Sequence, residues 1–191
     1  MGKTKMKTDP LYAHLGGNVV GGDPYSLCPN MWEWVIKKYN VSSVLDVGCG
    51  EGEALEYFKK KNIRVFGVDG LKENIDKLKE KNIDCYQLDL TKEHYVSDKK
   101  FDIIWCCELV EHVEEKFINN ILNTFLNGKV VLMTHALPRQ RGYHHVNCKN
   151  DEYWIGVMEN KGFEYLKEES IYSRLLAENT HWNKSGLIFQ K

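Results

Sequence analysis

The chain lacks several features that would place it in an obvious functional class. Its 191 residues carry 26 lysines and arginines against 27 aspartates and glutamates, so there is no excess of positive charge to attract nucleic acid. No apolar run reaches transmembrane length, and the opening MGKTKMKTDP has no apolar stretch typical of a secretory signal. The six cysteines form no C-x-x-C pair. We therefore expect one cytoplasmic domain with free thiols and no membrane partner; the charge balance disfavours a nucleic-acid partner but does not exclude one.

Short apolar runs alternate with amphipathic segments along most of the chain. We expect helices at 31–39, 53–61, 71–82, 114–127 and 150–161, and strands at 42–48, 63–69, 84–90, 101–108, 129–135, 163–169 and 185–191. This alternation predicts an α/β domain with a mostly parallel sheet over 31–191. Residues 1–30 are rich in glycine, proline and asparagine and are expected to form a lead that covers the domain, either structurally or in contact with a ligand.

A glycine-rich loop joins the first predicted strand to the helix after it. The stretch VLDVGCGEGEAL has glycines at 48, 50 and 52, which allow a sharp turn and close approach of a ligand at a helix N-terminus. A tight turn without a ligand would use the same residues. The dinucleotide fingerprint G-x-G-x-x-G requires glycine at position 53, where this chain has Glu53, so a nicotinamide-dependent oxidoreductase is disfavoured.

Four acidic residues follow successive predicted strands: Asp46, Asp69, Asp89 and Glu108. Asp69 lies about 20 residues after the glycine loop, where a carboxylate can accept both hydroxyls of a ribose. Acids at these strand ends suit a ligand with a ribose, an adenine and a positive charge, and they suit a pyrophosphate poorly.

Together, VLDVGCGEG, GVDG, LDL and FDIIWCCELVEHV resemble the class I S-adenosylmethionine-dependent methyltransferases over residues 40–135. The resemblance implies a Rossmann-like sheet of seven strands in the order 3-2-1-4-5-7-6, with the last strand antiparallel. It implies a cofactor site in which Asp69 binds the ribose, Asp89 and Leu90 flank the adenine, and Glu108 and Leu109 lie near the methionine. The remaining residues that we assign to this site are Asp46, Gly48, Cys49, Gly50, Gly52 and Gly70.

The segment ELVEH follows the fourth predicted strand, and the histidine-rich loop THALPRQRGYHHVN follows the fifth. If ELVEH forms a helical turn, Glu108, Glu111 and His112 lie on one face. Ligands bind at the carboxyl ends of parallel strands, so both segments should border the site of the methyl acceptor.

Three interpretations of these residues remain open. A general base could be His112, His135, His144 or His145, assisted by Glu111. Alternatively, Glu108, Glu111, His112 and one of His144 and His145 could hold Mg²⁺ or Mn²⁺, which would lower the pKa of an acceptor hydroxyl. The histidines could also be structural. The metal interpretation gains from a resemblance, because E-x-x-E-H followed by a histidine loop is similar to the metal site of small-RNA 2′-O-methyltransferases, and ubiquinone-biosynthesis O-methyltransferases carry a similar E-x-x-E-H.

Other side chains near the loop are ambiguous. Arg139 and Arg141 could bind an anionic acceptor or lie in solvent, and Tyr143, Tyr153 and Trp154 could line the acceptor site or pack in the core. Cys106 and Cys107 are expected to pack as small apolar residues.

The sequence therefore predicts a methyltransferase that acts on an oxygen of a small molecule or glycan. Metal-dependent methylation of RNA at the 2′-hydroxyl is an alternative, and an inactive cofactor-binding module ranks below both.

Overall fold

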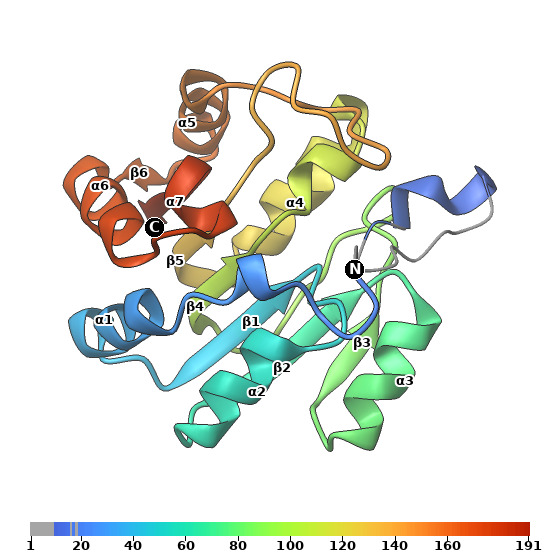
Figure 1. The fold of residues 1–191 in the computed structure, drawn as a ribbon, viewed down its shortest axis with the longest axis horizontal. Helices are drawn as coiled ribbons and strands as arrows, with labels where there is room; N and C mark the ends of the chain where they lie inside the picture. Colours follow the sequence, from blue (N-terminus) through green and yellow to red (C-terminus); the bar gives the residue numbers. More distant parts are fainter. Residues whose placement is uncertain (1–9, 16, 18) are drawn as a thin grey trace.

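The computed structural model describes residues 10–15, 17 and 19–191. Among these residues, seven strands form one sheet in the order β3-β2-β1-β4-β5-β7-β6 (Figure 1). The strands are β1 (Ser43–Val47), β2 (Arg64–Asp69), β3 (Cys85–Gln87), β4 (Phe101–Cys106), β5 (Gly128–Met133), β6 (Glu164–Tyr165) and β7 (Leu187–Gln190). Strands β1 to β5 are parallel, and β7 runs antiparallel to both β5 and β6. The predicted fold class, strand order and antiparallel last strand are confirmed.

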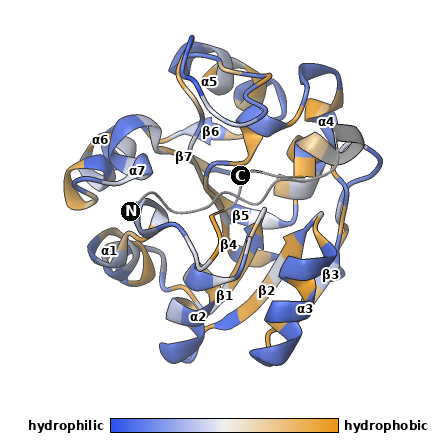
Figure 2. Ribbon diagram, turned by 45° about the vertical axis from the view of Figure 1, so that its right-hand side comes forward, coloured by the Kyte–Doolittle hydropathy of each residue, from blue (hydrophilic) through white to orange (hydrophobic). Residues whose placement is uncertain are grey.

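Helices cover both faces of this sheet, which explains why its strands are almost continuously apolar. The helices are η1 (Pro10–Leu15), η2 (Pro24–Ser26), α1 (Pro29–Tyr39), α2 (Glu53–Lys60), α3 (Lys72–Glu80), η3 (Val110–His112), η4 (Glu115–Phe117), α4 (Ile118–Phe125), α5 (Asp151–Asn160), α6 (Lys167–Leu176) and α7 (His181–Ser185). Buried residues of α1, α2, α3 and α7 form one apolar cluster, and those of α4 and α5 form the other. Figure 2 shows the apolar strands between these two layers. None of the described helices is long and apolar enough to cross a membrane.

The topology creates one edge at which a ligand can bind. The chain moves from β1 outward to β3 and then returns to β4 on the other side of β1. The loops after β1 and β4 therefore diverge, and the carboxyl ends of β1, β2, β4 and β5 border the opening between them. The glycine loop, ELVEH and the histidine loop all start at this edge.

The described part of the N-terminal lead lies across the same edge. The main-chain N–H of Gly21 donates to Glu51 Oε1 at 3.1 Å, and a Cβ on Gly17 would stand 3.0 Å from Cε1 of His112. These contacts agree with a covering role for the lead. The extent of that role over 1–30 stays a prediction, since residues 1–9, 16 and 18 lie outside the described part of the chain.

The predicted strand at 163–169 is wrong beyond its first residues. Only Glu164–Tyr165 pairs with β7, and helix α6 begins at Lys167. The segment KEES favours a helix, because two glutamates in the first turn interact well with the helix dipole. The stretch RLLAENTHW, for which we predicted no element, contains the end of α6, a short connection and the start of α7.

Candidate functional site

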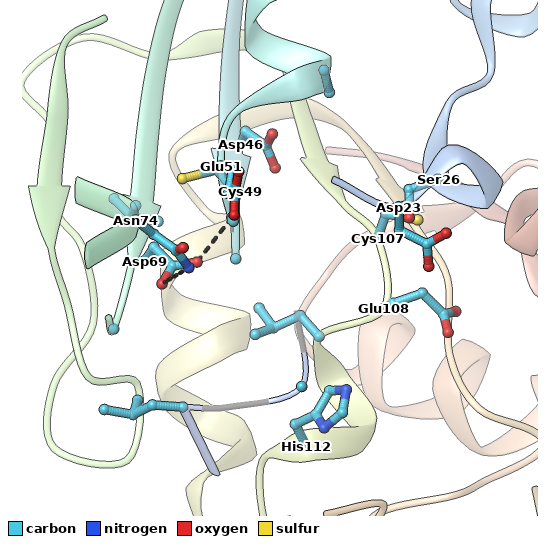
Figure 3. Close-up of a pocket in the computed structure, with 18 of the residues that line it drawn as sticks. Asp23, Ser26, Asp46, Cys49, Glu51, Asp69, Asn74, Cys107, Glu108 and His112 are labelled. Carbon is cyan, nitrogen blue, oxygen red and sulfur yellow. Dashed lines mark hydrogen bonds between the residues drawn. The ribbon is translucent and has the colours of Figure 1, made fainter. Parts of the chain in front are cut away.

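A cavity opens at the carboxyl edge of the sheet, beneath the N-terminal lead. It encloses about 1370 Å³ of space, part of it open to solvent. Nine of the residues predicted to bind the cofactor line it: Asp46, Gly48, Cys49, Gly50, Asp69, Gly70, Leu90, Glu108 and Leu109. No lysine or arginine is among its described lining residues. Figure 3 shows Asp69 and Asn74 on one side of the cavity, and Asp23, Cys107 and Glu108 on the other.

The glycine loop brings main chain directly to the cavity. The N–H groups of Gly48 and Cys49 both donate to the carbonyl of Val68, at 2.9 and 3.2 Å, which ties the loop to the end of β2. Gly48 has φ +76°, and a Cβ there would stand 2.9 Å from the Leu109 side chain. The turn therefore requires glycine both for its dihedral angle and for the close packing of the loop after β4.

Asp69 is held at the end of β2 by three donors. Its Oδ2 accepts from Gly50 N at 2.9 Å, and its Oδ1 accepts from Leu71 N at 2.8 Å and from Asn74 Nδ2 at 3.0 Å. Burial raises the pKa of Asp69, and the three hydrogen bonds work against that rise. The carboxylate thus has a fixed orientation and lines the cavity, as an acceptor for ribose hydroxyls requires.

Asp46 is a second buried acid in this part of the cavity. Its pKa is raised well above the usual range by burial first, and then by the charges of Asp69 and Glu53. A positively charged ligand nearby would favour its ionised form, because a cation offsets both the burial and the repulsion. The cavity is therefore suited to a cationic molecule.

Two predicted cofactor residues lie outside the cavity lining. Asp89 accepts from Thr91 Oγ1 at 2.6 Å and forms ion pairs with His14 at 3.2 Å and Lys92 at 2.9 Å. These contacts hold the pKa of Asp89 at about 2, although burial alone would raise it. At Gly52, a Cβ would stand 2.4 Å from Leu78 Cδ2, so this glycine permits packing of α2 on α3. The roles of both residues toward the cofactor stay predictions.

On the opposite side, Glu108 connects three parts of the chain. It has φ +53°, its N–H donates to Thr134 Oγ1 at 2.8 Å, and its Oε2 lies 3.5 Å from Nδ1 of His181. The other ring nitrogen of His181 lies 3.0 Å from Asp23 in the N-terminal lead. His181 and Asp23 were not predicted from the sequence, because no sequence pattern in the C-terminal helix or in the glycine-rich lead indicates that they lie beside β4.

Beyond Glu108, the turn η3 and the histidine loop form a compact cluster. Ligand-type atoms of Glu111, His112 and His145 all lie within 4.8 Å of one another. The two imidazole rings meet edge to face, with centroids 5.1 Å apart. His112 and His145 line the cavity, and Glu111 is fully buried behind them.

The Glu111 carboxylate is in an unusual state. Both of its oxygens are buried, and their only hydrogen-bond partners among the described residues are the Glu108 carboxylate, which has no proton to donate when both acids are ionised, and the main-chain N–H of Glu111 itself. Burial raises the pKa of Glu111 well above the usual range, and the neighbouring Glu108 carboxylate raises it further. A buried carboxylate without a cationic partner is costly, so this site favours either a bound cation or a bound proton.

The histidine loop is anchored to this cluster through the main chain. Val146 and Asn147 donate their N–H groups to the carbonyl of Glu111, at 2.9 and 3.1 Å. Nδ1 of His145 lies 3.2 Å from the carbonyl of Gln140, and a proton on Nδ1 leaves the lone pair of the ring on Nε2. A Cβ on Gly142 would stand 2.0 Å from that Nε2, so glycine makes room for the ring.

The other histidines of the loop lie apart from the cluster. His135 is buried with Nε2 3.0 Å from Asp151, which also pairs with Arg174 at 2.8 Å. This arrangement joins the loop to α5 and α6, and His135 does not line the cavity. His144 is half-buried, and its pKa is lowered by burial first and then by nearby His14. Assignments of His135 and His144 as catalytic bases stay predictions.

The structure also places the ambiguous side chains. Arg139 and Arg141 are exposed and outside the cavity lining, and Trp154 is part of the buried core. Cys106 is buried in the core, whereas Cys107 lines the cavity. Tyr153 donates its hydroxyl to Glu115 at 2.8 Å.

Taken together, the strand order and the acidic cavity define an α/β domain suited to a cationic ribonucleoside. Residues 44–127 match the family described as "Methyltransferase domain". A relative named ubiquinone biosynthesis O-methyltransferase, from Rickettsia bellii, is 30% identical over 147 residues, which are 72% of this chain and 60% of the relative. The chain therefore spans less than two thirds of that relative.

Two further similarities are more distant. A protein from Papaver bracteatum named probable (S)-tetrahydroprotoberberine N-methyltransferase 2 is 26% identical over 78% of this chain and 45% of its own length. The solved methyltransferase domain of bacterial CtHen1-C superposes with a TM-score of 0.59 at 18% identity, over 85% of this chain and 95% of that one. Over residues 44–127 the chain is therefore similar to methyltransferase domains, and the relatives that match most of its length are named methyltransferases.

Proposed function

We propose that this protein transfers a methyl group from S-adenosylmethionine to a hydroxyl oxygen of a small molecule or glycan, assisted by a divalent metal ion. The metal assignment is supported by the buried Glu111 carboxylate, which pairs with no lysine or arginine among the described residues and lies beside His112 and His145. The relative from Rickettsia bellii, which is named an O-methyltransferase of ubiquinone biosynthesis, supports a small-molecule acceptor.

The donor set fits a divalent metal. One carboxylate and two imidazoles within 4.8 Å of one another are suited to Mn²⁺ or a related ion, with Mg²⁺ favoured if more oxygen ligands join. Glu111, His112 and His145 would hold the ion, and Glu108 would stand next to Glu111. Such an ion would lower the pKa of an acceptor hydroxyl and orient it.

Asp69, Asp46 and the N-terminal lead would act at the cofactor end of the cavity. S-adenosylmethionine, when bound, would supply the methyl group and leave as neutral S-adenosylhomocysteine, and the acceptor hydroxyl would lose its proton to solvent. Asp69 would accept the ribose hydroxyls, and the buried Asp46 would favour the positive charge of the cofactor over its neutral product. Gly17, Val19 and Asp23 of the N-terminal lead line the cavity, and the lead would exclude water from the reacting atoms.

The charge of the cavity supports an acceptor without phosphate groups. Its described lining contains acids and four histidines, and the loop arginines Arg139 and Arg141 lie outside it. An anionic acceptor would find no guanidinium or ammonium partner there. We therefore favour an uncharged hydroxyl compound over an RNA end, and we propose that the protein acts in the cytoplasm without a nucleic-acid or membrane partner.

A calorimetric titration tests the metal assignment. Metal-stripped protein, saturated with S-adenosylhomocysteine, is titrated with Mn²⁺ alongside Glu111→Ala. Stoichiometric binding that disappears in the variant supports the site, and hydroxyl acceptors such as vicinal diols and catechols are then screened for methylation. Absence of binding by the unmodified protein would overturn the metal assignment and leave His112 or His145 as the base.

The salt dependence of RNA binding distinguishes an RNA acceptor from a small-molecule acceptor. If the acceptor were RNA, binding to a short duplex should weaken steeply with rising salt, because each phosphate contact releases counterions. We expect no measurable binding at about 0.15 M salt. Tight, salt-sensitive binding would contradict the small-molecule acceptor.

A further inference from the structure

Asn147 is a buried polar side chain of the histidine loop that has no partner. Its side chain is 1% exposed, and neither Oδ1 nor Nδ2 has a hydrogen-bond partner among the described residues. Two unsatisfied amide atoms in a buried position are uncommon, because each loses its hydrogen bonds to water without gaining a partner in the protein. An explanation is needed for why this loop keeps an asparagine there.

The position of Asn147 relates it to Glu111. Its N–H donates to the carbonyl of Glu111 at 3.1 Å, so the two residues are in direct main-chain contact. Val146 is 45% exposed, so it and the buried Asn147 face opposite sides of the loop. The asparagine amide therefore lies on the inner side of the loop, which also supplies His145 to the cluster.

The Asn147 amide and the Glu111 carboxylate do not satisfy each other. Neither amide atom of Asn147 forms a hydrogen bond to the Glu111 carboxylate. A cation bound by the Glu111 carboxylate and by Oδ1 of Asn147 would give both of these oxygens a partner. Side-chain amide oxygens are common ligands of hard divalent ions.

We propose that Asn147 is a further ligand of the metal, bound through its side-chain carbonyl oxygen. The inference rests on the proposed function, because it assumes the ion held by Glu111, His112 and His145. It adds a neutral oxygen donor to one carboxylate and two imidazoles, which favours Mn²⁺ or Mg²⁺ over softer ions.

The test is a Mn²⁺ titration of the full-length, metal-stripped protein saturated with S-adenosylhomocysteine. Asn147→Ala should weaken Mn²⁺ binding by about ten-fold or more, the scale seen when support for a metal site is lost. Asn147→Asp retains a ligand oxygen and should bind within about three-fold of the unmodified protein or more tightly. Asn119→Ala, at an exposed asparagine of α4, is the matched control and should bind unchanged.

The outcomes are separable. If the unmodified protein binds Mn²⁺ and Glu111→Ala abolishes binding, but Asn147→Ala binds normally, only the Asn147 assignment is overturned. If the unmodified protein binds no Mn²⁺, the metal part of the proposed function fails, and this inference fails with it. If Asn147→Ala does not fold, its melting temperature and its affinity for S-adenosylhomocysteine will reveal this. In that case Asn147→Asp decides between the two roles: a carboxylate can replace the amide as a metal ligand, but it cannot replace the hydrogen-bond donor of a purely structural amide.

Discussion

The two ends of the cavity differ in how fully the protein satisfies its own polar groups. At the cofactor end, Asp69 is half-buried and accepts three hydrogen bonds from the chain itself. At the acceptor end, Glu111 and Asn147 are almost completely buried; the Asn147 amide has no partner among the described residues, and the only side-chain partner of Glu111 is a second carboxylate, Glu108. The cofactor end is therefore preorganised before its ligand binds, whereas the acceptor end requires a bound cation or a bound proton. Substitutions at the two ends should therefore have opposite effects on stability and separate effects on binding.

The largest effect is expected from Glu111→Gln. Turnover should fall by about 100-fold or more if the metal assists the reaction. The metal-free variant should nevertheless be more stable by about 1 kcal/mol, because a buried carboxylate beside Glu108 is replaced by a neutral amide that can donate. Urea denaturation and a methylation assay measure the two changes. If Glu111→Gln kept full turnover or lost stability, the proposed difference between the two ends of the cavity would be wrong.

Asp69→Ala should act only at the cofactor end. Loss of a charged hydrogen-bond partner should weaken S-adenosylhomocysteine binding by about 1.5–3 kcal/mol, measured by calorimetry. Affinity for Mn²⁺ should stay unchanged, which provides the internal control. Unchanged affinity for S-adenosylhomocysteine would contradict the proposal that Asp69 binds the ribose.

Asp151→Asn tests whether the rear of the histidine loop is structural. Contacts with His135 first, and with Arg174, lower the pKa of Asp151 to about 2 from its ordinary 3.8. A lowered pKa in the folded state gives stability that is present above 3.8 and lost as the pH falls through about 2. The variant should be about 1–2 kcal/mol less stable at pH 7, with the difference shrinking over that window.

Thermal unfolding at several pH values measures this change. Turnover of folded Asp151→Asn should be nearly normal, since His135 lies outside the cavity lining. A large loss of turnover without loss of stability would instead assign His135 a catalytic role.

The smallest effect is expected from Gly142→Ala. The added Cβ would stand 2.0 Å from Nε2 of His145, so the ring must shift. Because the loop can adjust, Mn²⁺ affinity should fall by only about 1 kcal/mol, or five-fold. Gly156→Ala, where a Cβ meets nothing within 4 Å, is the control.

Much of the fold was predictable because its signals are local. The alternation of apolar runs and amphipathic helices predicts every parallel strand, and the spacing of the glycines predicts the turn after β1. The strand predicted at 163–169 failed because two paired residues are too short to produce a clear alternating pattern. The boundary between β6 and α6 depends on pairing with β7, which is not a local signal.

The site was predictable only where it follows strand ends. Asp69, Glu111 and His112 stand directly after strands or in the turns that follow them, so sequence order places them. His181 and Asp23 reach the cavity through tertiary packing alone, and Asn147 was not distinguished from other loop polar residues. The geometry of ELVEH also differs from a simple helical turn, since Glu108 has φ +53° and precedes η3.

The contact between His181 and Asp23 joins residues 158 positions apart in the sequence. During synthesis, the glycine loop and the first strands leave the ribosome long before α7 exists. Until α7 emerges, the lead that covers the cavity lacks this attachment, however well the sheet behind it has formed. Contacts of such long sequence separation form late because loop closure must precede them. The attachment of the lead to α7 should therefore form only when the chain is almost completely synthesised, at the same stage as the pairing of β7 with β5.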